Sequence, residues 1–516
     1  MRKHHEALPS EYGIAVSKLR RSALRLTAAV SAGFAVALLG AGSAGANVAL
    51  TRVSADPFTY GPAIDGAPVS HATEVEPDTF AHGSTVVGAF QVARVFDGGG
   101  VDVGVARSAD GGRTWRSRFM PGMTFSSGAA SPFERVSDAS VAFDARHSTW
   151  LVSSIPLLPN TSVPTVFVNR STDDGVTWSS PVQMPPPAAK QVDLDKNWTV
   201  CDNNSSSPFY GHCYTELDNF GQGDLELMST STDGGASWSV PIPTAGNDKG
   251  IGGQPLVQPT GTVIVPYEAL NGKIAAFRST DGGASWTKSA NVSGIRFHGV
   301  AGNLRTSPLP TAEIDHAGNV YVAWEDCRFR KQCASNDIVF SKSSDGVNWS
   351  DVARVPIDPV TSTVDHFIPG LGVDPTTAGS SAHLALTYYF YPQAACTTTS
   401  CRLAVGYISS PDGGAHWGDA TQLAGPMTLG EIAPTSQGPM TGDYISTSFS
   451  GATATALFPV GMVPTAGTAF DEATYAPTTP LAVATPAEAT HAASTAGAGP
   501  VTGVGTGETH HALREN

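Results

Sequence analysis

Carboxylate side chains recur at the openings of expected strands, where they could do chemistry if the fold brings them together. Oxygen ligands of this kind suit a hard divalent cation such as calcium, and the candidate ligands are Glu76, Asp195, Asp365 and Asp443. Paired carboxylates could equally perform the acid and base steps of glycoside hydrolysis. The third interpretation is structural, with each carboxylate capping a turn or accepting a hydrogen bond from neighbouring backbone. The sequence leaves these three interpretations open.

A second set of residues could bind or cleave a charged sugar. An arginine guanidinium holds a carboxylate through two parallel hydrogen bonds, and a carboxyl group can act as an acid or a base. The candidates of these types are Glu268, Arg278, Arg305, Arg328 and Asp138. Their spacing singles out none of them, and arginines are mostly exposed in folded proteins. The catalytic residues therefore stay unassigned.

One short pattern, Ser-x-Asp-x-Gly-x-x-Trp, occurs six times, with one copy a residue shorter. Its aspartate accepts hydrogen bonds from its own turn, its glycine allows a positive φ, and its tryptophan packs the turn onto an apolar layer. These residues are therefore predicted to be structural rather than catalytic. They are Asp110 and Trp115, Asp173 and Trp178, Asp233 and Trp238, Asp281 and Trp286, Asp345 and Trp349, and Asp412 and Trp417.

The pattern resembles the Asp box of sialidases and related BNR-repeat β-propellers, and the resemblance covers roughly residues 70–425. It implies an all-β propeller whose Asp-box turns lie on the outer rim, away from the ligand face. The box aspartates are spaced about 50 to 70 residues apart, which fits one four-stranded blade per repeat. Blade-like openings favour seven blades over six, closed by a strand near residues 56–60 that pairs with the other terminus.

The same resemblance can be tested against the sialidase catalytic set. Sialidases clamp the sugar carboxylate with an arginine triad, and they use an Asp acid/base and a Tyr nucleophile assisted by Glu. Their first arginine stands in a Phe/Tyr-Arg-Ile-Pro motif, where this chain has only Arg94 in a different context. Gly252 and Gln258 stand where two glutamates would be, although Glu268 could partly substitute. The resemblance therefore implies the fold more strongly than the activity.

The bulk charge excludes one class of partner. The chain carries 45 Asp and Glu against 30 Lys and Arg, a formal net charge of −15. Nucleic-acid binding needs a basic footprint, so no nucleic-acid partner is expected. A glycan or another surface ligand remains compatible with this charge.

The N-terminal residues 1–46 are predicted to be an export signal or an uncleaved membrane anchor. A basic segment precedes an apolar, Ala-rich run that ends on Ala44-Gly45-Ala46, an A-x-A cleavage pattern. Either interpretation places the rest of the chain outside the cell or on its surface, with membrane contact only through this segment. The six cysteines fit that compartment, since they form three close pairs predicted to be disulfides: Cys201 with Cys213, Cys327 with Cys333, and Cys396 with Cys401.

The predicted organisation is therefore a leader, a propeller over residues 51–476, and a tail. Residues 477–516 are rich in Ala, Thr, Pro and Gly, a composition that predicts disorder. The first functional hypothesis is an extracellular sialidase-like propeller that binds a glycan or surface ligand without an intact sialidase catalytic set. The alternatives are an exo-glycosidase, of exo-α-sialidase type, with a diverged active site, and an interaction scaffold of the cell envelope.

Overall fold

The computed structural model describes residues 48–58, 63, 64, 66–465 and 467–493. The predicted leader, residues 1–46, lies outside the described residues. Strands dominate, and the described helices are one α-helix, α1 (Pro486–Ala493), and short 3₁₀ turns: η1 (Phe220–Gln222), η2 (Ala301–Asn303), η3 (Lys331–Cys333), η4 (Gly379–Ser381) and η5 (Leu429–Glu431). Within the described ranges, no helix is both long and apolar enough to cross a membrane.

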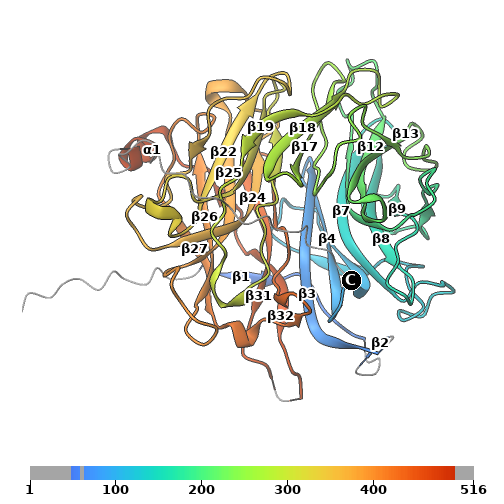
Figure 1. Ribbon diagram of the computed structural model, residues 1–516, viewed down its shortest axis with the longest axis horizontal. Helices are drawn as coiled ribbons and strands as arrows, with labels where there is room; N and C mark the ends of the chain where they lie inside the picture. Colours follow the sequence, from blue (N-terminus) through green and yellow to red (C-terminus); the bar gives the residue numbers. More distant parts are fainter. Residues whose placement is uncertain (1–47, 59–62, 65, 466, 494–516) are drawn as a thin grey trace, which may run out of the picture. The chain divides into compact units, whose positions relative to one another are not determined.

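Antiparallel groups of strands follow one another along the chain, each beginning with an inner strand (Figure 1). The first three groups are β3 (Ala67–His82), β4 (Thr85–Val95), β5 (Gly100–Ser108) and β6 (Arg116–Phe119); β7 (Arg135–Asp144), β8 (Thr149–Leu157), β9 (Phe167–Ser171) and β10 (Val182–Gln183); and β11 (Leu194–Cys201), β12 (Cys213–Asn219), β13 (Leu225–Ser231) and β14 (Ile242–Pro243).

The next three groups repeat the same order. They are β15 (Gly250–Ile251), β16 (Leu256–Val257), β17 (Val263–Ala269), β18 (Lys273–Ser279) and β19 (Ala290–Gly294); β20 (Thr311–Ile314), β21 (Val320–Asp326), β22 (Asp337–Ser343) and β23 (Ala353–Arg354); and β24 (Asp365–Val373), β25 (Leu384–Tyr391), β26 (Leu403–Ser410) and β27 (Thr421–Met427). The remaining strands are β2 (Ala63–Ile64), which pairs with β3, and the hairpin of β28 (Pro434–Thr435) and β29 (Gly438–Pro439).

A last group joins the two ends of the propeller. It contains β30 (Ser446–Ser450), β31 (Thr453–Gly461), β32 (Glu472–Pro477), β33 (Leu481–Ala482) and the N-terminal β1 (Leu50–Arg52). β1 pairs antiparallel with β32, and β30 lies between the inner strands β24 and β3, so the blue and red ends of the chain meet in Figure 1. The all-β propeller class is thus confirmed, whereas the choice between six and seven blades stays a prediction.

The closing strand lies earlier in the chain than predicted. It is β1, whereas residues 56–58 of the predicted segment form no strand. Pro57 has no N–H to donate to a ladder, and Asp56 instead accepts hydrogen bonds from the backbone N–H groups of Phe58 and Ala72, each at 2.8 Å. The Asp-Pro pair therefore makes a turn that anchors the chain to β3.

The Asp-box turns have the local hydrogen bonding that their composition predicts. In the first box, Asp110 accepts hydrogen bonds from the backbone N–H of Thr114 at 2.9 Å and from its hydroxyl at 2.7 Å. The shorter box keeps the same arrangement with one residue less, because Asp345 accepts from the N–H of Asn348 at 2.8 Å. The hydrogen bonds from Thr114 lower the pKa of the half-buried Asp110 to about 2. The box carboxylates thus bond within their own turns.

The three predicted disulfides are present, and each closes a short local loop. They join Cys201 to Cys213, Cys327 to Cys333, and Cys396 to Cys401. The described residues contain no free cysteine. The first bridge ties together β11 and β12, whose register places the two cysteines directly opposite each other.

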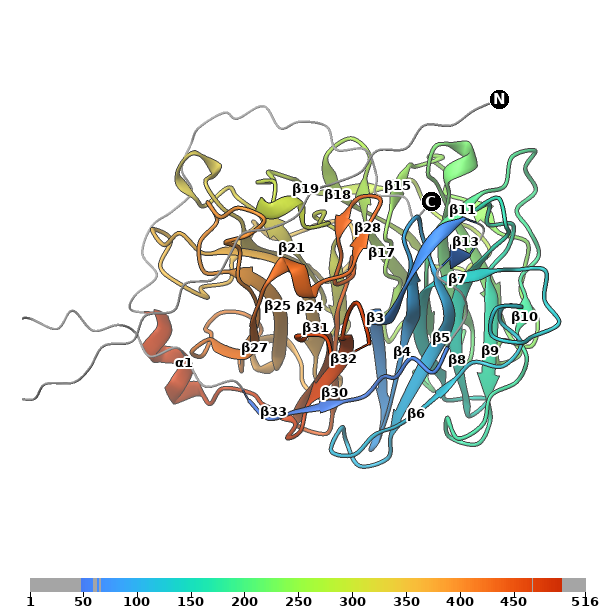
Figure 2. The same ribbon diagram turned by 90° about the horizontal axis from the view of Figure 1, so that it is seen from below.

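The beginning of the predicted disordered tail is folded onto the propeller (Figure 2). β33 pairs with β31, and the Tyr407 hydroxyl donates to the Ala482 carbonyl at 2.9 Å. Thr485 caps the first turn of α1 together with Glu488. A composition poor in large apolar residues still allows a short segment to pair with an existing sheet edge, because the sheet supplies the partners. Residues 494–516 lie outside the described ranges.

Candidate functional site

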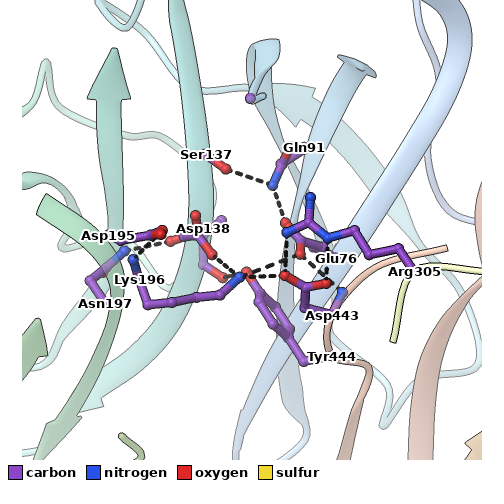
Figure 3. A network of polar contacts seen from close by, with 12 residues as sticks. Glu76, Gln91, Ser137, Asp138, Asp195, Lys196, Asn197, Arg305, Asp443 and Tyr444 are labelled. Atoms are coloured by element: carbon purple, nitrogen blue, oxygen red, sulfur yellow. Dashed lines mark hydrogen bonds and ion pairs between the residues drawn. The ribbon is translucent and has the colours of Figure 1, made fainter. Parts of the chain in front are cut away.

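A buried network of charges lies where the inner strands of several blades begin (Figure 3). Its centre is the Lys196 ammonium on β11, which is 2.9 Å from Asp138 Oδ1 on β7 and 2.9 Å from Asp443 Oδ2. Glu76 Oε1 on β3 is 3.7 Å away. These side chains come from segments up to 367 residues apart, and all are less than 5% exposed. The propeller therefore gathers opposite charges at one point of its interior.

Arg305 completes this network. Its guanidinium donates in parallel to both oxygens of Asp443, from Nε at 2.9 Å and from Nη2 at 2.5 Å. Burial alone would raise the pKa of Asp443, but the nearby charges of Arg305 and Lys196 outweigh it and hold that pKa well below its usual range. The fork that could have bound a sugar carboxylate thus binds a carboxylate of the protein itself.

Bulges in the inner strands aim these side chains. Glu76, Asp138 and Lys196 all have positive φ, at 54°, 49° and 45°, and each stands at an interruption of its strand register. Ile368 on β24 repeats the feature with φ of 48°. A non-glycine residue in this conformation is strained, and a bulge re-aims its side chain. The sequence does not predict these bulges, because glycine is the residue that usually marks a positive φ and none of the four residues is glycine.

A second layer of polar side chains holds Glu76. Gln91 donates its amide to Glu76 Oε2 and, at 2.8 Å, to the Ser137 hydroxyl. Arg94 in turn donates to Gln91 Oε1 at 2.8 Å. The backbone N–H of Asp443 donates to Glu76 Oε1 at 3.0 Å. Glu76 therefore links β3 to the segment that leads into β30.

A cavity of about 20 Å³ adjoins the network. Its lining includes Lys196, Asn197, Trp198, Glu216, Gln254 and Tyr444. Trp198 is half-buried and meets the Tyr444 ring edge-on, with ring centroids 5.3 Å apart. A volume of this size holds roughly one water molecule, whereas a site that encloses a small ligand takes about 300 Å³ or more. As it stands, the cavity can accept a water or an ion, and a sugar could only rest across its mouth.

The structure brings together two of the five catalytic candidates. Asp138 and Arg305 both belong to the buried network. Arg278 instead donates to the Asp345 carbonyl at 2.8 Å, in an Asp-box turn, and Arg328 pairs with Asp326 at 2.7 Å. Glu268 is half-buried on β17, and burial raises its pKa to about 7. No arginine is part of the lining of the described cavity.

The four metal candidates do not form one site. Glu76 and Asp443 have Lys196 or Arg305 beside them, which supply positive charge in place of an ion. Asp195 Oδ1 accepts the N–H of Lys196 at 2.9 Å. Asp365 accepts the N–H of Asn336 at 2.6 Å, and burial raises its pKa to about 7. Each of the four carboxylates thus has a partner within the protein, while the choice among the three interpretations stays a prediction.

Two other groups of ligand-type side chains lie close together within the described ranges, and neither is suited to a metal. Asp144 adjoins Cys201 and Cys213, whose sulfurs are consumed in their disulfide. The second group, Asp337, Asp358 and His366, is ion-paired with arginines: Arg330 and Arg354 both contact the two carboxylates, for example at 2.5 Å and 2.8 Å from Asp337. Burial lowers the pKa of His366 to about 4.

Comparison with known proteins gives one family match and one curated relative. Residues 89–293 match the family described as the BNR repeat-like domain. A curated sialidase of Bacteroides fragilis (strain YCH46) is 28% identical over 168 residues, which cover 27% of this chain and 29% of the relative. The match thus spans less than a third of the relative's length.

Several solved structures are similar to this chain. The Hadza microbial sialidase Hz136 is 17% identical, with 79% of this chain and 66% of that chain covered and a TM-score of 0.40. The NanB sialidase from Streptococcus pneumoniae is 13% identical, with coverages of 83% and 71% and a TM-score of 0.40. A protein of unknown function from Dyadobacter fermentans DSM 18053 is 15% identical, with coverages of 66% and 97% and a TM-score of 0.44.

Proposed function

This chain is a sialidase-like BNR-repeat protein, and from that premise we propose that it is an extracellular binding propeller. It holds a glycan or another surface ligand at the end of the propeller where the inner strands begin, and it lacks an intact sialidase catalytic set. Three local disulfides support an oxidising compartment. A fold alone does not establish an activity, so the proposal depends on the site.

The observation that carries the proposal is that the cations of the network are ion-paired. Arg305 is forked onto Asp443, and Lys196 lies among Asp138, Asp443 and Glu76. A substrate carboxylate would have to displace a buried carboxylate of the protein to reach either cation. That displacement would leave an uncompensated buried charge, which costs about 3–5 kcal/mol. The network therefore favours holding the fold together over binding an acidic sugar.

The groups left for a ligand are aromatic and neutral polar. Trp198 presents a half-buried ring at the cavity. The amides of Asn197 and Gln254 also line it, each with one end already bonded to backbone, at the Asp138 carbonyl and the Ala312 N–H. Rings of this kind combine an apolar face with a polar edge, which suits a neutral sugar resting on the cavity mouth. We expect Trp198 to be the main contact.

A second candidate, an exo-glycosidase with a diverged active site, is favoured by Glu268. Its carboxyl is half-buried, and burial raises its pKa to about 7, the range in which a general acid works best at neutral pH. Burial also raises the pKa of its electrostatic neighbour Glu325. Glu268 would then be the proton donor of the reaction.

One pair of assays separates the two candidates. The purified full chain is incubated with a fluorogenic sialoside, and its binding to neutral and sialylated oligosaccharides is measured by calorimetry. We expect no release of sialic acid above the blank, and binding that Trp198→Ala weakens about tenfold or more. Phe220→Ala, which removes an exposed aromatic outside the cavity lining, is the matched control and should leave binding unchanged.

Three results would contradict the proposal. Robust turnover that Glu268→Gln abolishes would make the chain a glycosidase. Tight binding of sialylated but not neutral oligosaccharides would show that the paired cations open to an acidic sugar. Absence of binding to any oligosaccharide, with Trp198→Ala silent, would favour the scaffold alternative.

A further inference from the structure

A row of carboxylates crosses the blade formed by β11–β14. The strand register places Asp195 on β11 opposite Asp218 on β12, and Asp218 opposite Glu226 on β13. Glu216 stands two residues before Asp218 on the same strand, so it points to the same face. Like charges that face each other across strands destabilise a sheet. The row therefore needs a source of positive charge or protons.

This face of the blade packs against the following blade. Tyr214, two residues before Glu216, belongs to the apolar cluster that also contains Tyr267 and Phe277 of β17 and β18. Glu216 itself lies on the backbone of Gly253, where an added Cβ would come within 2.7 Å of Glu216 Cγ. The carboxylates thus lie on the face that packs against the following blade, and none of the three glutamate and aspartate side chains on β12 and β13 is exposed to bulk water.

Three of these side chains are completely buried and unsatisfied. Glu216, Asp218 and Glu226 have 0% exposure. Within the described part of the chain, no group of the protein meets hydrogen-bond geometry with their carboxyl oxygens. The Glu216 and Glu226 carboxyls interact with each other, and the Gly253 backbone N–H interacts with Glu216, whereas Asp218 has only other carboxylates around it. Burial raises the pKa of Glu216 to about 8 and raises the pKa values of Asp218 and Glu226 well above their usual range. Buried polar groups without partners are rare in native proteins.

The available cation does not resolve this excess of negative charge. Lys196 lies nearby, but its ammonium contacts Asp138 and Asp443 at 2.9 Å. The cavity of about 20 Å³ described above is partly lined by Glu216, and this space can hold a water-sized body. Glu216 reaches this space, and the fully buried Asp218 and Glu226 continue the same face behind it, so a cation is the charge that the face lacks.

We propose that a divalent hard cation, with calcium as its expected identity, binds between β12 and β13 through Glu216, Asp218 and Glu226. Calcium takes six to eight oxygen ligands at about 2.3–2.6 Å, and carboxylates are its preferred side-chain ligands. The three ligand atoms do not all lie within 4.8 Å of one another. Cation binding therefore requires the three carboxylates to move closer together. The inference does not depend on the proposed glycan binding.

The test uses the purified full chain after treatment with a chelator. Its melting temperature is followed during titration with CaCl2 and, in parallel, MgCl2, and retained metal is measured by mass spectrometry before chelation. A ligand that binds only the folded state stabilises it in a concentration-dependent way. We expect a saturable rise in melting temperature that is larger with Ca²⁺, and about one Ca²⁺ per chain.

Variants locate the site. Asp218→Asn and Glu226→Gln each remove one charge at constant volume, and we expect the calcium response to weaken about tenfold or more in both. Because the substitution also relieves repulsion, the melting temperature in chelator should not fall. Glu325→Gln is the matched control, since Glu325 is equally buried on another blade and accepts the N–H of Ile368 at 2.8 Å. It should respond to calcium like the wild type.

Two outcomes overturn the inference. A wild-type protein that retains no metal and melts at the same temperature with and without Ca²⁺ would show that protons neutralise the carboxylates. An equal calcium response in the wild type, Asp218→Asn and Glu226→Gln would place the cation elsewhere. If one variant does not fold, the other variant and the metal content of the wild type still decide.

Discussion

Substitution of Lys196 by methionine removes the central cation of the buried network. Methionine fills a similar volume, and its side chain suits a buried position. Of the two cations in the network, only Arg305 then remains beside the carboxylates of Glu76, Asp138 and Asp443. We therefore expect a large loss of stability.

The size of the loss follows from the contacts. Each ion pair at 2.9 Å to Lys196 is worth about 6 kcal/mol gross at an effective dielectric constant of about 20. Methionine needs no desolvation of an ammonium group, and the remaining carboxylates can take up protons, so most of the gross value is offset. Measured cases of removing one partner from a buried pair give about 3–5 kcal/mol, which is a large part of a typical stability of about 5–15 kcal/mol.

The assay is urea denaturation followed by tryptophan fluorescence, at several pH values. In the wild type, the depressed pKa of Asp443 contributes stability that is present above its unfolded pKa of about 3.9 and is lost as the pH falls through its lower folded value. In Lys196→Met, unpaired carboxylates acquire raised pKa values and lose stability as the pH rises above about 4. The difference between the two proteins should therefore be greatest at pH 7 and should shrink toward pH 4.

The control is Lys273→Met, which changes an exposed lysine at the start of β18 and should alter stability by less than about 0.5 kcal/mol. The reasoning is refuted if Lys196→Met lies within about 1 kcal/mol of the wild type at pH 7. It is also refuted if the difference grows as the pH falls toward 4. Either result would mean that the network is hydrated and contributes like a surface ion pair.

Three further predictions concern stability and covalent structure. Peptide mass spectrometry of the non-reduced protein should find the disulfides Cys201–Cys213, Cys327–Cys333 and Cys396–Cys401. A cross-link between different pairs would contradict the structure. Trp238→Ala should cost about 3–5 kcal/mol in urea denaturation, because its ring is 7% exposed, and an unchanged midpoint would show that the ring is not needed. Burial raises the pKa of Asp102 to about 7, so its ionisation should lower the free energy of unfolding as the pH rises from about 4 to 7. Asp102→Asn should flatten that part of the curve of stability against pH. A variant curve that runs parallel to the wild-type curve would contradict this prediction.

The fold could be predicted because its signals are local. Each Asp box contains the residues of its own turn, as the hydrogen bonds of Asp110 and Asp345 with their own turn residues show. The disulfides were predictable for the same reason, since their partners are 5 to 12 residues apart. The closing strand β1 could not be placed, because three residues carry no periodic pattern and their position depends on β32 at the other end of the chain.

The site was predictable in residue type but not in arrangement. The candidate carboxylates were found at strand openings, yet nothing in the sequence indicated that Lys196 would lie between Asp138 and Asp443. That contact depends on bulges with positive φ at Asp138 and Lys196, which no glycine marks. Glu216, Asp218 and Glu226 were not predicted either, because an alternating acidic pattern in a strand usually indicates a solvent-facing side.

The buried acids of this propeller differ in what satisfies them, and that difference separates structure from function. Asp78 accepts the N–H of Val141 at 2.7 Å, and Glu325 accepts that of Ile368 at 2.8 Å, so each carboxylate bonds the inner strand of the next blade. Asp443 is satisfied by cations of the chain itself. Such groups stabilise the fold and need no ligand. A buried carboxylate requires an outside partner only where the chain offers neither an N–H nor a cation, and the face that carries Asp218 and Glu226 is where both are missing among the described residues. The unsatisfied groups, rather than the most highly charged cluster, therefore mark where this propeller needs an outside partner.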